Sequence, residues 1–220
     1  MKTTLTQLVI LAATALAAAV LVTACGTTSG YKQADKTGAG IAEFRDEIVN
    51  GKTAIDATIK ALDQIAVTAN TDPRQAFEQY AKHVAHLEST AARARKRAQD
   101  MQTQGKAYFA AWEKQLAEVK NEEIRKLATD RRAKLQETFD SIKKVAEPLK
   151  TQFDPWMSDL KDLQKFLGND LTIAGVDAAK SLFAKTKGEG IEVQKSMDAL
   201  VAELNTVAAT VTPAKVAPKQ

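Results

Sequence analysis

The chain has 220 residues with a formal net charge of only +4, and its charged residues, 26% of the total, are of both signs, so it lacks the concentrated positive charge typical of nucleic-acid-binding proteins. A single cysteine excludes an internal disulfide, and with only two histidines the usual Cys- and His-rich zinc sites are excluded too. Abundant Ala, Lys, Glu, Gln and Leu with few Pro favour a folded, helical protein.

The first 24 residues combine a basic start, Met1-Lys2, with a long uncharged apolar run. The run is long enough to cross a membrane as a helix. Its position at the extreme N-terminus, and the small residues Thr23 and Ala24 directly before Cys25, instead favour a cleaved signal peptide. Residues 22–25, Val-Thr-Ala-Cys, resemble the end of a bacterial lipoprotein signal, which has an aliphatic residue, two small residues and then the cysteine.

The resemblance implies that residues 1–24 are a lipoprotein signal peptide and that Cys25, the first residue of the mature protein, carries acyl chains such as palmitate. Several acyl chains hold a protein on a membrane far more firmly than one. Because Gly26 and not an aspartate follows Cys25, the sorting rule of enteric-type bacteria implies the periplasmic face of the outer membrane. Residues 25–38 are then expected to be the acylated cysteine and a flexible tether.

Apolar residues spaced three and four apart predict that the first helix extends from about Ile41 to Ala69. Asp72 as N-cap and Pro73 at the first helical position predict the start of the second helix. Its heptad seam continues to Val119, and the seam positions in its middle are small. A partner helix must therefore approach closely there or supply bulky side chains. The small seam residues are Ala91, Ala94, Ala98 and Gly105.

An asparagine cap followed by two acids, Asn121-Glu122-Glu123, predicts a turn and the start of the third helix. The alternative is one helix from Pro73 to Leu167, about 140 Å long. Two prolines, Pro148 and Pro155, lie inside the third helix and are expected to bend it without ending it, since its apolar seam keeps its phase.

Residues 168–170, Gly-Asn-Asp, are predicted to close the third helix and cap the fourth, which then extends to Thr212. Its apolar stripe is expected to begin with Leu171, Ala178 and Leu182, and residues 188–190 to form a kink or a short break. The sequence thus predicts an all-α fold: an elongated antiparallel bundle of about four long, coiled-coil-like helices over residues 39–212. Residues 213–220 are expected to be a disordered tail.

Four short motifs in the centre of the chain are similar to a family of bacterial lipoproteins whose helical domain has no known function. The resemblance implies a lipoprotein signal and a helical domain of about this length, and it implies no catalytic or binding residues. The motifs lie at residues 112–116, 121–125, 147–149 and 160–163.

The densest cluster of cations is Arg93, Arg95, Lys96 and Arg97. Such a cluster could contact lipid phosphates or peptidoglycan carboxylates, although an ordinary solvated helix face with acids nearby is the favoured interpretation. Phe109 lies off the seam and is the better candidate for contact with a protein partner.

Tyr108, Trp112 and Trp156 lie on the seams and are predicted to be core residues. His83 and His86 share a helix face but lack further ligands, so no metal site and no cofactor is predicted.

No nucleophile–base set and no phosphate-binding loop is present in the sequence, and the seams leave no evident pocket, so the protein is not expected to be an enzyme. We expect a membrane-anchored envelope lipoprotein that serves as a helical scaffold, spacer or protein-interaction surface. One alternative is a periplasmic binding or chaperone-like module for client proteins or cell-wall polymers, which a cleft lined by exposed apolar side chains would favour. Another is self-assembly through the seam of the second helix. The sequence leaves the oligomeric state open.

Overall fold

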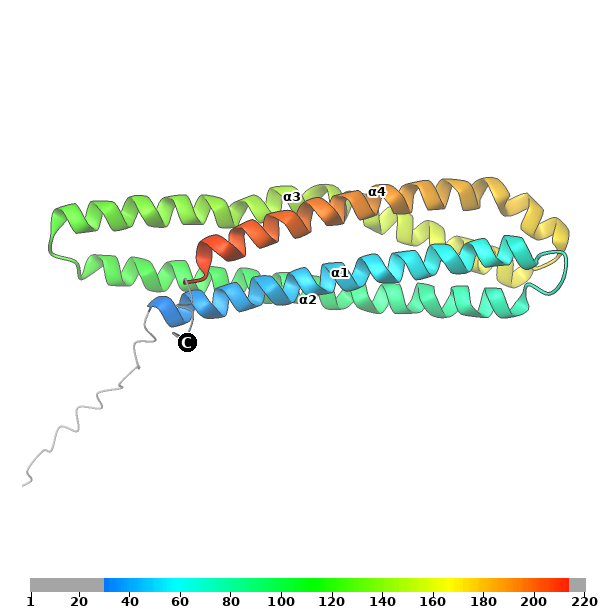
Figure 1. Ribbon diagram of the computed structural model, residues 1–220, viewed down its shortest axis with the longest axis horizontal. Coiled ribbons are helices and arrows are strands. Elements are labelled where there is room, and N and C mark those ends of the chain that lie inside the picture. Colours follow the sequence, from blue (N-terminus) through cyan, green and yellow to red (C-terminus); the bar gives the residue numbers. More distant parts are fainter. Residues whose placement is uncertain (1–29, 214–220) are drawn as a thin grey trace, which may run out of the picture.

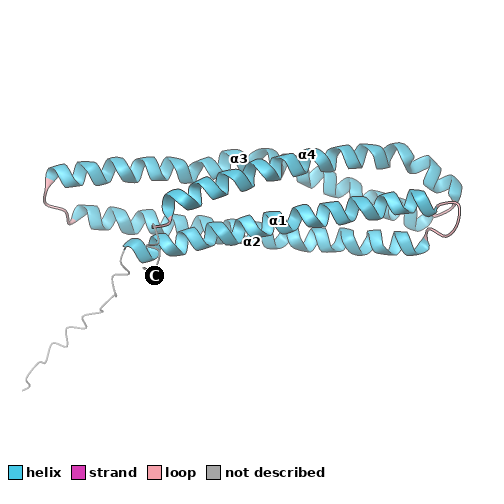
Figure 2. Ribbon diagram, viewed as in Figure 1, coloured by secondary structure: helices cyan, strands magenta, loops and turns pink. Residues whose placement is uncertain are grey.

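A computed structural model describes residues 30–213 of the chain as a long bundle of four antiparallel helices (Figure 1). The helices are α1 (Gly30–Thr68), α2 (Arg74–Ala117), α3 (Glu122–Asn169) and α4 (Ile173–Val211). Short turns join them, and all regular structure within this range is helical (Figure 2). The expected all-α, up-and-down bundle is confirmed. Cys25, the expected signal peptide at residues 1–24 and residues 214–220 of the expected tail lie outside the described range.

The helices form a ring in which each one packs against two others: α1 against α2 and α4, and α3 against α2 and α4. Packing is closest between α1 and α2 and sparsest between α2 and α3. One apolar core extends along the whole bundle and includes the side chains Ile41, Tyr80, Trp156, Leu160 and Leu204. With 44 residues, α2 is about 66 Å long.

The first helix begins at Gly30, so the residues from Gly30 to residue 38 are helical and the expectation of a tether over 25–38 is wrong for them. Small side chains explain the early start. Ala34, Thr37 and Gly38 are buried, and Gly38 packs directly against Thr212 at the end of α4. This segment therefore belongs to the bundle.

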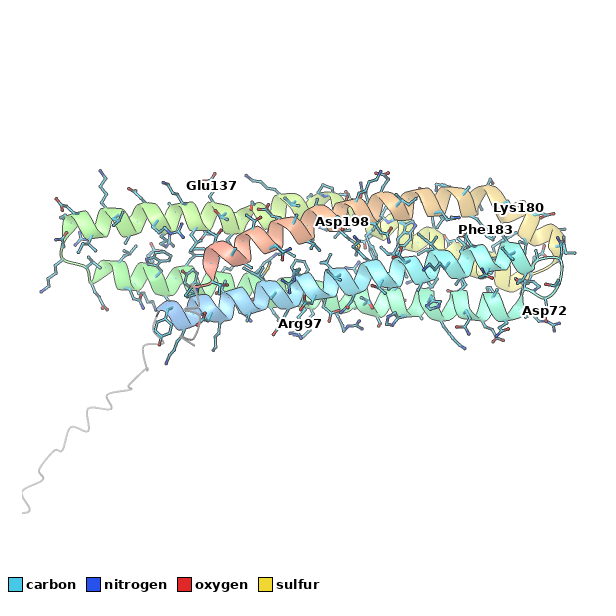
Figure 3. The ribbon with its side chains drawn as sticks, in the orientation of Figure 1. Asp72, Arg97, Glu137, Lys180, Phe183 and Asp198 are labelled. Carbon is cyan, nitrogen blue, oxygen red and sulfur yellow. The ribbon has the colours of Figure 1, made fainter. Side chains whose placement is uncertain are left out.

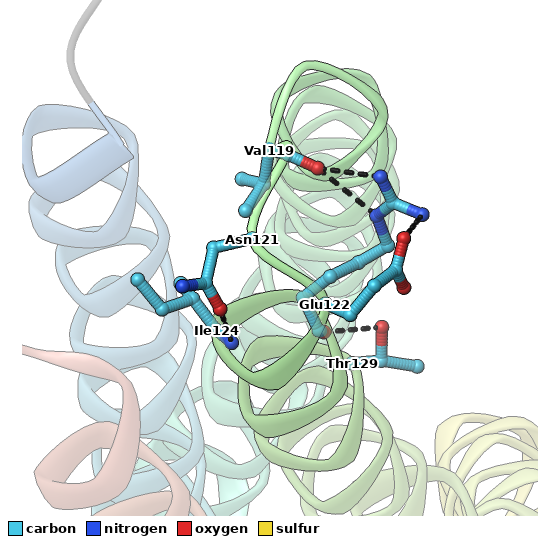
Figure 4. Close-up of polar contacts among 6 residues, drawn as sticks. Val119, Asn121, Glu122, Ile124 and Thr129 are labelled. Atoms are coloured by element: carbon cyan, nitrogen blue, oxygen red, sulfur yellow. Dashed lines mark hydrogen bonds and ion pairs between the residues drawn. The ribbon is translucent and has the colours of Figure 1, made fainter.

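The predicted turn between the second and third helices is confirmed, and the single-helix alternative is wrong. Asn121 is the N-cap of α3, and its side-chain oxygen accepts a hydrogen bond of 3.0 Å from the backbone N–H of Ile124 (Figure 4). Arg125 closes the turn from the other side, because its guanidinium donates to the carbonyl of Val119 at 2.7 and 3.0 Å. At the start of α2, Asp72 accepts from the backbone N–H of Arg74, and Pro73 occupies the cap position.

Both internal prolines, Pro148 and Pro155, lie within α3 as predicted. Each lacks the N–H that would bond the carbonyl four residues earlier, and this loss lets a helix bend. In Figure 1 the first part of α3 lies along one edge of the bundle, and its second part crosses behind α4 toward the opposite edge. The change of direction sets how α3 meets α2.

The fourth helix starts later than expected and faces the core with different residues. Thr172 is its N-cap, accepting from the N–H of Gly175 at 3.1 Å, so the expected cap at residues 168–170 is wrong. Phe183 takes the inward position, and Leu182, which lies 100° around the helix, is exposed. The expected stripe positions Ala178 and Leu182 are therefore also wrong, and the buried residues near the start of α4 are Gly175, Val176, Ala179 and Phe183.

Residues 188–190 neither break nor end α4, which is continuous through them. Gly190 lies against the indole ring of Trp156, where a Cβ would come within 3.0 Å of the ring. The indole Nε1–H of Trp156 donates to the carbonyl of Thr186 at 2.7 Å. Glycine at this position thus lets α4 approach the largest buried side chain of α3.

Candidate apolar-ligand site between α2 and α3

The sparse packing between α2 and α3 has its origin in the sequence of both helices. The inward face of α2 has only methyl groups at Ala91, Ala94 and Ala98. Opposite, Pro148 and Pro155 bracket the turns of α3 that face these alanines. With small side chains on one helix and a bend in the other, the two helices pack loosely at this level.

A cavity of about 270 Å³ remains in the middle of the bundle, and it contradicts the expectation that the helical seams leave no pocket. All four helices contribute to its wall, which is mostly hydrocarbon. The exposed residues of its lining, Arg95, Lys150 and Asp154, place its mouth between α2 and α3. The apolar side chains in the wall include Phe44 and Ile48 of α1, Leu87, Ala91, Ala94 and Ala98 of α2, Leu149 and Phe153 of α3, and Met197 and Leu200 of α4.

Four charged side chains line the cavity, three of them at its mouth. Arg95 of α2 reaches across it to Asp154 of α3, with Nη2 and Oδ1 2.5 Å apart, and its guanidinium lies 5.8 Å from the centre of the Phe153 ring. Glu47 is paired with Arg93 at 3.3 Å. Lys150, the fourth, enters no ion pair within residues 30–213. The mouth therefore offers one cation that is free to meet an anionic group.

The gap continues beyond the cavity toward the start of α2. Two further hollows of about 250 and 360 Å³ follow it along the same boundary, and Glu88 and Lys161 face both of them. Lys161 pairs with Glu88 across the gap. The two helices are thus joined here by exposed ion pairs more than by packed side chains.

A buried hydrogen bond also joins α2 and α3 at this boundary. The hydroxyl of Tyr80 on α2 donates to the backbone carbonyl of Leu160 on α3 at 2.8 Å, and both residues are fully buried. Burial raises the pKa of the Tyr80 phenol, because the charged form would lose its hydration.

The predicted basic cluster does not form a single surface. Arg93 and Arg97 pair with Glu47 and Glu43 of α1, Arg95 pairs with Asp154 of α3, and Lys96 pairs with Asp100 of its own helix. Arg97 lies on the outside of the bundle in Figure 3. A contact with lipid phosphates or peptidoglycan has to compete with these carboxylates, and it remains a prediction.

Phe109 is not an exposed partner-binding residue, so that prediction is wrong. Its side chain is only 3% exposed, and its ring packs edge-on against that of Phe139 at 5.8 Å. At this level α2 faces α1 on one side and α3 on the other, so the neighbours Tyr108 and Phe109 are both buried. The prediction that Tyr108 and Trp156 are core residues is confirmed, while Trp112 is only partly buried.

Two further findings concern the described residues alone. Within residues 30–213 no group of three His, Cys, Asp or Glu side chains is arranged to hold a metal ion, His83 and His86 included. None of the four helices is both long and apolar enough to span a membrane.

Sequence reasoning missed the cavity, although the run of small residues at Ala91, Ala94 and Ala98 indicated where it would lie.

Comparison with known proteins adds one match. A family model with the description "Protein of unknown function (DUF2959)" matches residues 27–211. No curated protein and no solved structure matches the chain.

Proposed function

The chain belongs to the DUF2959 family, a family of unknown function, and we propose that this member is a lipid-anchored, non-catalytic envelope protein that binds an apolar ligand. The observation that carries the proposal is the cavity in the middle of the bundle, which has a hydrocarbon wall and an open mouth. Ligand pockets in proteins are commonly concave, mostly apolar and bordered by a few polar groups.

The cost of the empty space supports binding over a purely structural role. Cavities made in protein cores cost about 24 cal/mol per Å³, so an enclosed void of 270 Å³ would cost at most about 6 kcal/mol. Because the mouth is open to water, the actual cost is lower. A scaffold or spacer gains nothing from such a space, whereas an apolar ligand would restore the missing contacts.

The charges at the mouth narrow the choice of ligand. Lys150 is unpaired within the described residues, and Arg95 needs only to leave the exposed carboxylate of Asp154 to face a ligand. We therefore propose an amphiphile whose hydrocarbon chain fills the cavity while an anionic head group lies at the mouth.

The envelope location in this proposal is supported by Val22-Thr23-Ala24-Cys25. Acyl chains on Cys25 would attach the protein to a membrane, with the periplasmic face of the outer membrane as the proposed site. A role as a scaffold that contacts another envelope protein or peptidoglycan is the second candidate, and the roughly 66 Å length of α2 favours it. Self-assembly through the seam of α2 is less well supported, because Tyr80, Val84 and Leu87 of that seam are already buried.

Photo-crosslinking in intact cells tests the proposed ligand. A photoreactive residue replaces Lys150 at the mouth in one variant and Lys144, exposed on another face of α3, in the control. Mass spectrometry of the purified protein is expected to show a lipid-sized adduct at position 150 and none at position 144. The adduct at position 150 should disappear when Ala94→Leu fills the cavity.

Two other results would contradict the proposal. Adducts of equal yield at both positions would mean nonspecific capture, and a protein-sized adduct at position 150 would favour the scaffold. The intact mass of the same preparation tests the anchor separately: it should equal Cys25–Gln220 plus acyl chains, and a mass that includes Met1 would restore the membrane-spanning interpretation of residues 1–24.

A further inference from the structure

The turn between α2 and α3 projects beyond the rest of the bundle. Ser141 of α3 contacts Glu203 of α4, and since the helices are antiparallel, α4 reaches back along α3 only to about residue 133. The first turns of α3 therefore have no α4 beside them. We call residues 116–127, which form the end of α2, the turn and the start of α3, the hairpin tip.

Large apolar side chains are exposed on the hairpin tip. Ile124 is 55% exposed and Leu127 is 72% exposed, and they lie on one face of α3 because they are three residues apart. Leu116 and Val119 beside them are half-buried. Toward the centre of the bundle the same helix buries Leu135 and Phe139. The apolar surface of α3 thus continues past the point where the other helices cover it.

The hairpin tip lies at the same end of the bundle as the start of α1. Gly30, the first residue of α1, packs against Gln115, one residue before the tip. Figure 1 shows the start of α1 at the end of the bundle where the turn joins α2 and α3. Cys25 precedes Gly30 by only five residues, which can span at most about 18 Å. Tyr31, in the first turn of α1, is exposed at this end as well. An anchor at Cys25 would therefore hold the hairpin tip within reach of the membrane.

We propose that the hairpin tip lies on the lipid surface into which the acyl chains of Cys25 insert, so that the bundle is held by two contacts. The inference rests on the lipid anchor of the proposed function but not on its cavity. Ile124 and Leu127 enter the boundary between head groups and acyl chains, and Tyr31 lies at the level of the head groups, which suits its apolar ring and polar hydroxyl.

The charges of the tip agree with a lipid surface. Within residues 116–127 there are three cations and three carboxylates, so the segment has no net charge and anionic head groups would not repel it. Lys120 and Lys126 enter no ion pair in the part of the chain that the structure describes. Long lysine side chains beside apolar residues can reach phosphate groups while their methylenes stay in the apolar layer.

The opposite end of the bundle provides a matched control. Val67, beside the turn between α1 and α2, is 71% exposed, nearly the same as Leu127. It lies at the far end of α1 from Gly30, and the 39 residues of α1 separate the two ends by about 58 Å. Exposure is thus equal at both positions, and only distance from the anchor differs.

Site-specific fluorescence on the full-length protein in vesicles of phosphatidylethanolamine and phosphatidylglycerol tests the proposal. Cys25 is the only native cysteine, and lipidation blocks its thiol, so Leu127→Cys and Val67→Cys each accept one environment-sensitive label. The label at position 127 should be quenched several-fold more by nitroxide-bearing lipids than by iodide in the buffer. The label at position 67 should be quenched by iodide alone.

Equal quenching of both labels by iodide in a sample whose mass confirms lipidated Cys25 would overturn the proposal while leaving the anchor intact. Energy transfer between tips that rises with protein density would show that a second copy, and not lipid, covers the tip. A sample whose mass retains Met1 would overturn the anchor and this proposal together, whereas the crosslink at Lys150 would be unaffected.

Discussion

The hydroxyl of Tyr80 and the backbone carbonyl of Leu160, 2.8 Å apart, form a buried hydrogen bond between α2 and α3, the two neighbouring helices with the sparsest packing. Such bonds contribute about 1 kcal/mol each. At this boundary the two helices are otherwise held mainly by exposed ion pairs. Loss of the hydrogen bond is therefore expected to weaken the packing along the whole boundary between α2 and α3.

The change Tyr80→Phe is accordingly predicted to lower the free energy of unfolding by about 1 kcal/mol at neutral pH. It should also change the pH dependence. Because burial raises the pKa of Tyr80, its contribution is present below the unfolded pKa of about 10 and is lost as the pH rises above that value. Urea unfolding followed by circular dichroism from about pH 7 to about pH 11 should show a shallower alkaline loss in the variant than in the wild type. Tyr31→Phe, an exposed control, should leave both quantities unchanged.

Filling the cavity should stabilise the protein and abolish ligand binding. Ala94→Leu adds three carbon atoms inside the cavity, and we expect a gain of about 1 kcal/mol in the free energy of unfolding. Ala92→Leu makes the same change on an exposed face of α2 and should have little effect on stability or on the Lys150 adduct. Destabilisation by Ala94→Leu alone would mean that the space beside it is not available to a side chain.

Two glycines in helices are predicted to respond in opposite ways to alanine. A Cβ at Gly105 would overlap the ring of Phe139, so Gly105→Ala should destabilise the protein by about 1–3 kcal/mol. Gly188 has no atom within 4 Å of the added Cβ, and Gly188→Ala should stabilise by about 0.5–1 kcal/mol through helix propensity. Thermal unfolding measures both. Combining Gly105→Ala with Phe139→Leu should recover part of the lost stability. If the double variant recovers none, overlap with the Phe139 ring is not the cause of the loss.

Removing the cap of α3 should loosen the hairpin tip without unfolding the bundle. Asn121→Ala deletes the acceptor of the hydrogen bond from Ile124, at a cost of about 1 kcal/mol. Faster hydrogen exchange is expected in the first turn of α3 and not near Trp156. Asn50→Ala, at an exposed position inside α1, serves as the control, and equal effects of the two changes would contradict a capping role.

Local signals in the sequence were enough to predict the turn between α2 and α3 and the two prolines inside α3. Asn121 followed by two acids gave the start of α3, because a cap depends only on residues within one turn. Pro148 and Pro155 were correctly placed inside α3 because the apolar phase continued across them. These predictions needed no knowledge of neighbouring helices.

The site could not be predicted in the same way, because it depends on the distance between two helices. A seam shows which side of a helix faces inward, but it does not show which partner lies opposite or how closely it approaches. The alanines at 91, 94 and 98 were compatible with close packing as well as with a cavity, and only the course of α3 decides between them. Phe109 was misjudged for a similar reason: it faces Phe139 at a level where α2 has neighbours on two sides.

The ion pairs that join α2 and α3 beside the cavity are expected to affect how fast a ligand exchanges. Arg95–Asp154 and Lys161–Glu88 have exposed partners, so dissolved ions screen their attraction, whereas the hydrocarbon wall behind them is insensitive to screening. Raising the ionic strength should therefore speed both the entry and the departure of a ligand while changing the equilibrium of its hydrocarbon chain far less. The salt content of the surrounding compartment would then act as a control on the kinetics of loading.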